Sequence, residues 1–264
     1  KSLADKLHLK CIDKGHEFYK NLGSVRSCPV CNIPSTERRW LNFFDSRNIK
    51  YIVHYKLNGV ELDIFLPDHN IAIECCGLYY HSINDSLYGK VIKRDQHFNK
   101  RKLCEENGIR LFTILDNENN SPIWESIIDN ALGFSKKIFA RKCKIKKVEP
   151  KEAKEFLINN HLMGYCTAKS IGLYHEENLV ALFTYKKCKN NGLEVSRFCN
   201  LRRFNIIGGF SKLLKYAEEE SKPSYVLSFV DLRYGNGSSL LKNDFEIKGV
   251  TLGWRWTDFH NTYN

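Results

Sequence analysis

The chain has 264 residues, of which 42% are hydrophobic and 27% are charged. This composition is ordinary for a globular protein and excludes a chain that is disordered along its whole length. No run of about 18 apolar residues occurs, so we expect no transmembrane helix. The opening residues, KSLADKLHLK, lack the apolar stretch of a signal peptide, so we expect a soluble, cytoplasmic protein.

Basic residues outnumber acidic ones, with 41 Lys and Arg against 30 Asp and Glu and a formal net charge of +11. Such an excess favours a polyanionic partner, because basic side chains that neutralise phosphates release counterions. The alternative is a solvated basic surface without a partner. The ten cysteines favour metal ligands or buried thiols over disulfides in an intracellular chain.

The first segment, residues 1–34, carries a Cys/His cluster. Cys11, His16, Cys28 and Cys31 form the pattern C-x4-H-x11-C-x2-C. Zinc takes four such ligands in a tetrahedron, and a module of this size needs a metal to fold. Two alternatives are reduced core thiols beside a surface histidine, and a redox C-x-x-C pair.

The second segment, residues 35–135, alternates strands and helices. A helix is expected over 36–47, with Ser35 and Thr36 as candidate caps. Asn58-Gly59 separates two β-rich runs, which predicts a hairpin. Further signals are Gly108 after a helix and Pro122 at the start of another. The order predicted is helix, three strands, helix, strand, helix, over 36–47, 51–57, 60–66, 71–76, 94–107, 109–115 and 123–132.

Two acidic residues lie in neighbouring predicted strands of this segment. Asp63 is within VELDIFLP and Glu74 is within NIAIECCG. Carboxylates on adjacent strands can meet over one divalent ion, and hard oxygen ligands together with a substrate phosphate suit Mg²⁺. His81 follows shortly after Glu74 and can act as an acid, a base or a phosphate contact. The alternative is that these are exposed polar positions.

Two helices can add further groups to this site. His97 and Lys100 share one face of the helix expected from residue 94. The competing interpretation makes this a charged outer face, with Phe98 in the core. Glu37, on the opening helix, can bring a carboxylate beside Asp63, or can simply favour the helix dipole.

These residues resemble the PD-(D/E)xK nuclease superfamily, and more closely its branch of very-short-patch repair endonucleases and phage homing endonucleases with the EDxHD signature. The likeness covers residues 8–118. The matching residues are Glu37, Asp63, Glu74, His81 and Asp95.

The resemblance implies a Mg²⁺-dependent DNA endonuclease, located in the host-cell cytoplasm if a phage encodes it. The lysine of the superfamily's Glu-x-Lys would fall at Cys76, so the proton-transfer role stays open between His81, His97 and Lys100. Asp95 and His97 both remain candidates for the last position of the EDxHD signature.

The third segment, residues 136–264, begins with the basic run KKIFARKCKIKK. Its strands, and a helix entered through Gly208-Gly209, resemble the N-acetyltransferase-like fold. RRFNIIGGFSK has only the paired glycines of the acetyltransferase phosphate loop, but a helix N-terminus can bind the phosphate of a cofactor or of DNA, and the surrounding basic residues favour DNA. The strands are expected near 142–148, 170–176, 179–187, 193–199 and 225–231, with helices over 150–160 and 209–221. The candidate DNA contacts are Lys136, Lys137, Arg141, Lys142, Lys144, Arg202, Arg203 and Lys212.

The sequence therefore predicts an α/β protein with a mixed-sheet nuclease core flanked by helices, preceded by a zinc module and followed by a second α/β domain. The expected function is site-specific cleavage of double-stranded DNA with catalytic Mg²⁺ and structural Zn²⁺. A non-catalytic nucleic-acid-binding protein and an acetyltransferase-like enzyme are the alternatives. The oligomeric state is open and a monomer is compatible with the sequence. The final residues, HNTYN, do not mark an obvious end of the last element, so the sequence is also compatible with a truncated chain.

Overall fold

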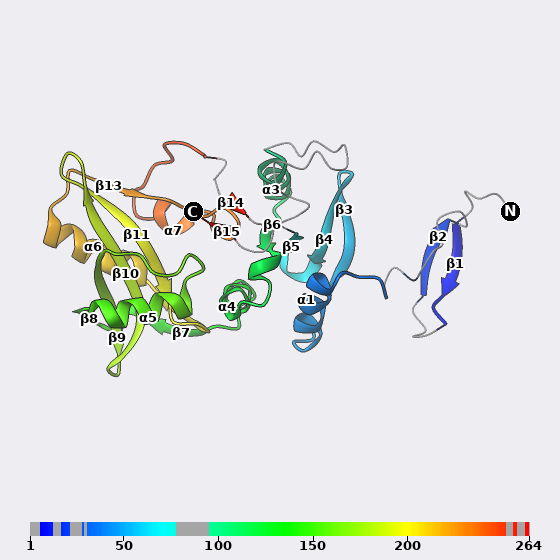
Figure 1. The fold of residues 1–264 in the computed structure, drawn as a ribbon, viewed down its shortest axis with the longest axis horizontal. Coiled ribbons are helices and arrows are strands. Elements are labelled where there is room, and N and C mark those ends of the chain that lie inside the picture. Colours follow the sequence, from blue (N-terminus) through cyan, green and yellow to red (C-terminus); the bar gives the residue numbers. More distant parts are fainter. Residues whose placement is uncertain are drawn as a thin grey trace. The chain divides into compact units, whose positions relative to one another are not determined.

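The computed structural model describes residues 6–12, 17–21, 28, 31–77, 95–251, 256–257 and 262–263. Contacts divide the chain into two units, Lys1–Cys75 and Cys76–Asn264. Both units contain strands and most of the helices lie in the second, so the protein is of the mixed α/β class that the sequence predicted (Figure 1). No helix within the described ranges is long and apolar enough to cross a membrane.

The first unit opens with a hairpin that the sequence did not predict. Strands β1 (Lys6–Lys10) and β2 (Glu17–Asn21) pair in antiparallel orientation. Helix α1 (Ser35–Asp45) follows, and it buries Trp40 and Phe44 completely. The expected caps were wrong, because Pro34 takes the N-cap position and no side chain caps the helix.

Three antiparallel strands complete the first unit. They are β3 (Ile52–Leu57), β4 (Val60–Leu66) and β5 (Ile71–Cys76), close to the predicted ranges. The predicted turn joins β3 and β4: Asn58 has φ 49° and Gly59 has φ 84°, as a two-residue hairpin turn with two left-handed positions requires. This turn sets the register that pairs Leu57 with Val60 and Val53 with Ile64.

The second unit begins, among described residues, with helix α3 (Gln96–Glu106), strand β6 (Arg110–Leu115) and helix α4 (Pro122–Ala131). All three agree with the sequence prediction to within two residues at each end. Ser121 caps α4 by accepting a hydrogen bond from the backbone N–H of Ile123 at 3.3 Å, and Pro122 stands at the first helical position.

A five-stranded sheet in the order β13-β11-β10-β9-β8 dominates the rest of this unit. Strands β8 to β11 pair in antiparallel orientation, whereas β11 and β13 are parallel, so the sheet is mixed. The strands are β8 (Lys144–Lys147), β9 (Lys169–His175), β10 (Asn178–Cys188), β11 (Gly192–Asn200) and β13 (Tyr225–Ser228).

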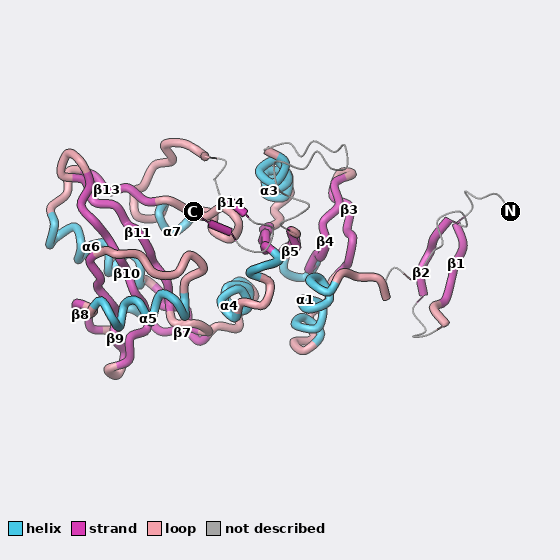
Figure 2. The backbone as a smooth tube through the Cα atoms, in the orientation of Figure 1, coloured by secondary structure: helices cyan, strands magenta, loops and turns pink. Residues whose placement is uncertain are grey.

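Two helices cover opposite faces of this sheet (Figure 2). Helix α6 (Gly209–Ser221) packs its apolar side against a cluster that includes Phe183 and Tyr185 of β10. Helix α5 (Pro150–Asn160) packs on the other face, in a cluster that includes Leu182. Because successive strand residues point to opposite faces, β10 supplies both clusters and is buried on both sides.

The basic run at the start of the third segment forms more than the single strand predicted. It comprises strand β7 (Lys136–Phe139), a 3-10 turn (Ala140–Lys142) and then β8. Strand β7 pairs in parallel with β12 (Phe204–Ile207), which the sequence did not predict. Short elements α7 (Ser238–Leu241), β14 (Trp256–Thr257) and β15 (Thr262–Tyr263) follow β13.

Candidate active site and metal centre

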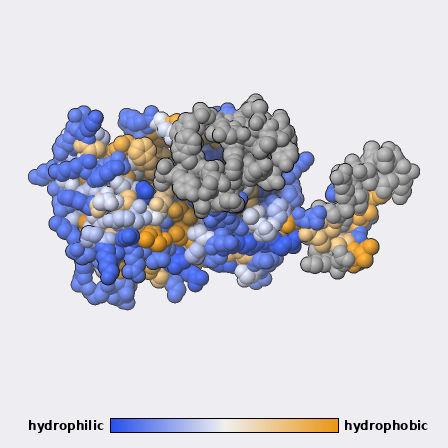
Figure 3. Space-filling model, viewed as in Figure 1, coloured by the Kyte–Doolittle hydropathy of each residue, from blue (hydrophilic) through white to orange (hydrophobic). Residues whose placement is uncertain are grey.

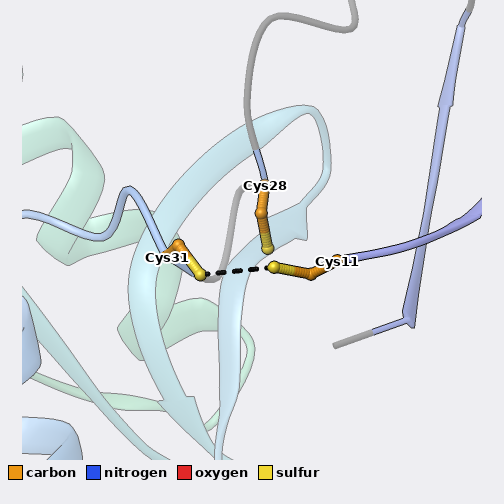
Figure 4. Close-up of side chains that lie close together, drawn as sticks. All are labelled: Cys11, Cys28 and Cys31. Carbon is orange, nitrogen blue, oxygen red and sulfur yellow. Dashed lines mark hydrogen bonds between the residues drawn. The ribbon is translucent and has the colours of Figure 1, made fainter. Parts of the chain in front are cut away.

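Three cysteines of the predicted zinc cluster come together in the first unit. The ligand atoms of Cys11, Cys28 and Cys31 lie within 4.8 Å of one another, and their sulfur atoms point toward a common centre (Figure 4). The Sγ atoms of Cys11 and Cys31 are 3.6 Å apart. Desolvation and the two neighbouring thiols raise the pKa of Cys31 to about 11. These three residues can hold a metal ion, because a cation reverses the repulsion between closely spaced thiolates. His16, the fourth predicted ligand, lies outside the described residues.

The three-cysteine cluster is connected to helix α1 by hydrogen bonds. One guanidinium nitrogen of Arg38 donates to the backbone carbonyl of Cys31 at 2.7 Å and to that of Ile33 at 3.3 Å. Arg38 follows Glu37 directly in the sequence. The side chain of Arg38 therefore connects the cysteine cluster to the start of the helix that carries Glu37.

Asp63 and Glu74 lie on the same side of two neighbouring strands. The register pairs Phe65 with Ala72 and ends at the pair Ile64 and Ile73, so Asp63 and Glu74 each lie one residue beyond its last pair. Asp63 is two residues from Phe65 and Glu74 is two residues from Ala72, and alternate residues of a strand point to the same side of the sheet. In addition, Oδ2 of Asp63 accepts a hydrogen bond from the backbone N–H of Cys75 at 2.8 Å.

Two of the candidate carboxylates are buried. Glu37 and Glu74 are each 7% exposed. Burial, and after it the charge of Asp63, raise the pKa of Glu37 to about 7, while His54 opposes this shift and Glu61 adds to it. The Oε2 atom of Glu37 has no hydrogen-bond partner among the described residues. Burial of such a group is costly unless a partner or a cation compensates it.

His54 and Glu61 are residues that the sequence analysis did not single out. Nδ1 of His54 lies 3.1 Å from Oε1 of Glu61, and both side chains are partly exposed. Their positions alternate with apolar residues along two strands, which looks like an ordinary solvated face. Only the strand register shows that His54 lies at the step facing Asp63.

The candidate residues of α3 lie in the second unit. His97 and Lys100 are half-buried, and they share their side of the helix with Cys104, which is fully buried. Nδ1 of His97 lies 3.9 Å from Sγ of Cys76, the last residue of β5. This side therefore faces the protein, whereas Phe98 is 36% exposed. Asp95 is exposed at the N-cap of α3, and His81 lies outside the described residues.

The candidate DNA-contacting residues fall into two kinds. Most are exposed: Lys136, Lys137, Arg141, Lys142, Lys144 and Arg203. Arg203 joins the others because its backbone carbonyl accepts a hydrogen bond from the N–H of Lys136 at 2.8 Å. Hydrophilic residues likewise dominate the visible face around α5 and α6 (Figure 3).

Lys212 and Arg202 of the same set are half-buried. Nζ of Lys212 donates to the carbonyls of Ala140 and Cys143 at 3.0 and 2.6 Å, so this side chain stabilises the turn after β7. The backbone N–H of Arg202 donates to Oδ1 of Asn160 at 2.8 Å.

The fold and the site together define a mixed α/β protein with a three-cysteine cluster that can bind a metal and with two buried carboxylates, those of Glu37 and Glu74. No protein-family model and no curated protein sequence matches the chain. Among solved structures, the catalytic domain of the homing endonuclease I-Bth0305I is similar at 24% identity and a TM-score of 0.28, over 38% of this chain and 89% of that domain. A possible acetyltransferase from Clostridium difficile 630 is similar at 11% identity and a TM-score of 0.32, over 44% of this chain and 98% of that one. Both TM-scores are below 0.5, so neither likeness establishes an activity.

Proposed function

We propose that this chain is a site-specific DNA endonuclease that hydrolyses phosphodiester bonds with Mg²⁺. The observation that carries the proposal is that Asp63 and Glu74 lie on the same side of β4 and β5, just beyond their last paired residues, with the buried carboxylate of Glu37 in electrostatic contact with Asp63. A basic chain with net charge +11 suits double-stranded DNA as the substrate.

The residues present fit a hard divalent cation. The donors are carboxylate oxygens, and the buried Oε2 of Glu37 has no hydrogen-bond partner among the described residues. We propose that Asp63 and Glu74 hold Mg²⁺. When bound, Mg²⁺ polarises the scissile phosphate and lowers the pKa of an attacking water.

The chain's own residues orient the substrate and move protons. In this proposal His81 assists proton transfer or stabilises charge on the phosphate, and His97 and Lys100 are the alternatives for that role. Glu37 and Asp95 are the other acidic residues to which we assign a catalytic role. Glu37 can accept a proton near neutral pH, because its pKa is raised to about 7 by burial and by Asp63.

The remaining parts of the chain have supporting roles in the proposal. Cys11, His16, Cys28 and Cys31 hold a structural Zn²⁺ in a module over 1–34. Residues 35–135 form the endonuclease domain, and residues 136–264 form a basic, N-acetyltransferase-like domain that contacts DNA. The proposed contacts are Lys136, Lys137, Arg141, Lys142, Lys144, Arg202, Arg203 and Lys212.

The test compares the native chain with Asp63→Asn on plasmid and long phage DNA in Mg²⁺. Asparagine keeps an oxygen that can accept the hydrogen bond from Cys75, but removes the charge that a cation needs. We expect Asp63→Asn to cut about 100-fold more slowly or worse. The matched control is Asp68→Asn, because Asp68 is exposed in the turn between β4 and β5 and should be dispensable.

Other outcomes assign the chain to another class. Tight DNA binding without cutting by the native chain indicates a non-catalytic nucleic-acid-binding protein. Binding of acetyl-coenzyme A, without any cutting of DNA, indicates an acetyltransferase-like enzyme. Equal cutting by the native chain and Asp63→Asn contradicts the proposed metal site.

A further inference from the structure

His54 has an unusual backbone conformation at a particular place in the sheet. Val53 pairs with Ile64 and Tyr55 pairs with Leu62, so His54 occupies the step that faces Asp63. Its φ is 53°, in the left-handed region, although it lies inside β3. A non-glycine residue seldom adopts this conformation within a strand, and such positions are concentrated at functional sites.

The imidazole of His54 is oriented by a carboxylate. Nδ1 lies 3.1 Å from Oε1 of Glu61. Glu61 stands two residues before Asp63 on β4, so the two acidic side chains share one side of the strand. Glu61 thereby holds the imidazole on the side of Asp63. A ring nitrogen that hydrogen-bonds a carboxylate fixes the orientation of the ring and directs the second nitrogen, Nε2, outward.

Groups from three elements converge here. The carboxylate of Glu37, from α1, interacts electrostatically with Asp63, His54 and Glu61. Among these groups His54 is the one that can carry positive charge. Its side chain is 40% exposed, so a ligand can reach it, whereas Glu37 is buried. A simple surface ion pair between β3 and β4 would require neither the left-handed backbone nor the nearby buried carboxylate.

We propose that His54, held by Glu61, contacts the phosphate of the DNA strand bound at Asp63 and Glu74. This inference rests on the proposed nuclease function. In the imidazolium form Nδ1 donates to Glu61, and Nε2 donates to a non-bridging phosphate oxygen. The contact reduces the repulsion between the phosphodiester and the surrounding carboxylates. His54 is thus a catalytic residue that touches substrate, and Glu61 is a positioning residue.

The experiment uses the full chain with variants that tolerate the left-handed backbone. Glycine and asparagine both adopt positive φ, so His54→Gly and His54→Asn remove the imidazole without forcing a new strand conformation. The matched control is His69→Ala, because His69 is exposed in the turn before β5. Thermal unfolding of each variant checks that the fold is retained.

Cleavage of supercoiled plasmid in Mg²⁺ is measured with and without added imidazole. We expect His54→Gly and His54→Asn to cut about 100-fold more slowly, and His69→Ala to cut like the native chain. Added imidazole should restore part of the activity of His54→Gly and none of that of Asp63→Asn. Glu61→Gln should cut about 10-fold more slowly and should not respond to imidazole.

Three results overturn the inference, and the first two are distinguishable from failure of the nuclease proposal. If the native chain cuts and Asp63→Asn does not, but the His54 variants cut at the native rate, the nuclease proposal stands and the role of His54 is wrong. The role is also wrong if imidazole leaves a folded, inactive His54→Gly unchanged. If the native chain cuts no DNA, the nuclease proposal and the inference fail together.

Discussion

The guanidinium of Arg38 donates a hydrogen bond to the backbone carbonyl of Cys31 at 2.7 Å. This contact joins the three-cysteine cluster to the first turn of α1. Loss of a bound metal should therefore lower the stability of the helix that carries Glu37, and not only that of the cysteine module.

The cysteine cluster should bind one metal ion per chain. We expect Cys28→Ser to lose that ion and to unfold at a lower temperature, because a small module without a core folds on its metal. Cys188→Ser, at a cysteine remote in sequence, should keep the ion. Metal analysis by mass spectrometry and thermal unfolding check both variants. An ion retained by Cys28→Ser would show that this cysteine is not a ligand.

Glu37 should make the stability of the fold depend on pH. Its pKa is raised from 4.5 to about 7, so the folded state binds a proton that the unfolded state has lost. Below pH 4.5 the carboxyl of Glu37 is protonated in both states and does not lower the free energy of unfolding. As the pH rises from 4.5 to about 7, the free energy of unfolding falls because of this group. Glu37→Gln has no carboxyl to titrate, so it should not lose stability in this way. At pH 8 its free energy of unfolding should exceed that of the native chain by up to about 3 kcal/mol.

Urea unfolding at pH 4.5 and pH 8, in magnesium-free buffer, measures the difference for Glu37. The matched control is Glu125→Gln, because Glu125 occupies the corresponding first turn of α4. If both variants gain the same free energy of unfolding at pH 8, the effect comes from the helix dipole and not from the burial of Glu37.

Arg233 should stabilise the second unit through a pair of acidic partners. Its guanidinium lies 2.5 Å from Glu118 and 2.8 Å from Asp231, and the three side chains are at most 17% exposed. Arg233→Met leaves two largely inaccessible carboxylates without this partner, so we expect a loss of about 3–5 kcal/mol in the free energy of unfolding. Lys248→Met breaks an exposed pair with Glu246 and should lower the free energy of unfolding far less, because solvent screens exposed ion pairs. Urea unfolding compares the two, and equal losses would contradict a buried role for Arg233.

The exposed lysines of β7 and the following turn should contribute to DNA affinity through phosphate contacts. Lys137→Ala combined with Lys142→Ala should lower the slope of log affinity against log salt by about 1 for each contact removed. Lys187→Ala, at an exposed lysine of β10, should leave the slope unchanged. Fluorescence anisotropy across a salt series measures the slopes. An unchanged slope in the double variant would exclude these lysines from the DNA contact.

Local signals in the sequence were sufficient for most of the core elements. The Asn58-Gly59 turn, the apolar runs of β4 and β5, and Pro122 each act within a few residues, so their consequences could be predicted. The C-x2-C pattern likewise indicated the cysteine cluster, of which Cys28 and Cys31 are part.

Contacts between distant parts of the chain could not be predicted. Strands β7 and β12 pair although almost 70 residues separate them in the sequence. Each has only four residues, too few for a clear alternation of apolar and polar side chains. His54 looked like an exposed strand residue, because its relation to Asp63 depends on the register of two strands and on its own backbone. The first helix was predicted correctly, but its cap was not, because Pro34 already supplies an extended residue before the first turn.

The tight turn at Asn58 and Gly59 makes the chemistry of the site depend on the length of a surface loop. One inserted residue there would slip β3 by a single step against β4, and a strand that slips by one residue turns every side chain to the other face. Val53 or Tyr55 would then replace His54 beside Asp63. An apolar or phenolic side chain would face the acidic residues, although the composition of both strands would be unchanged.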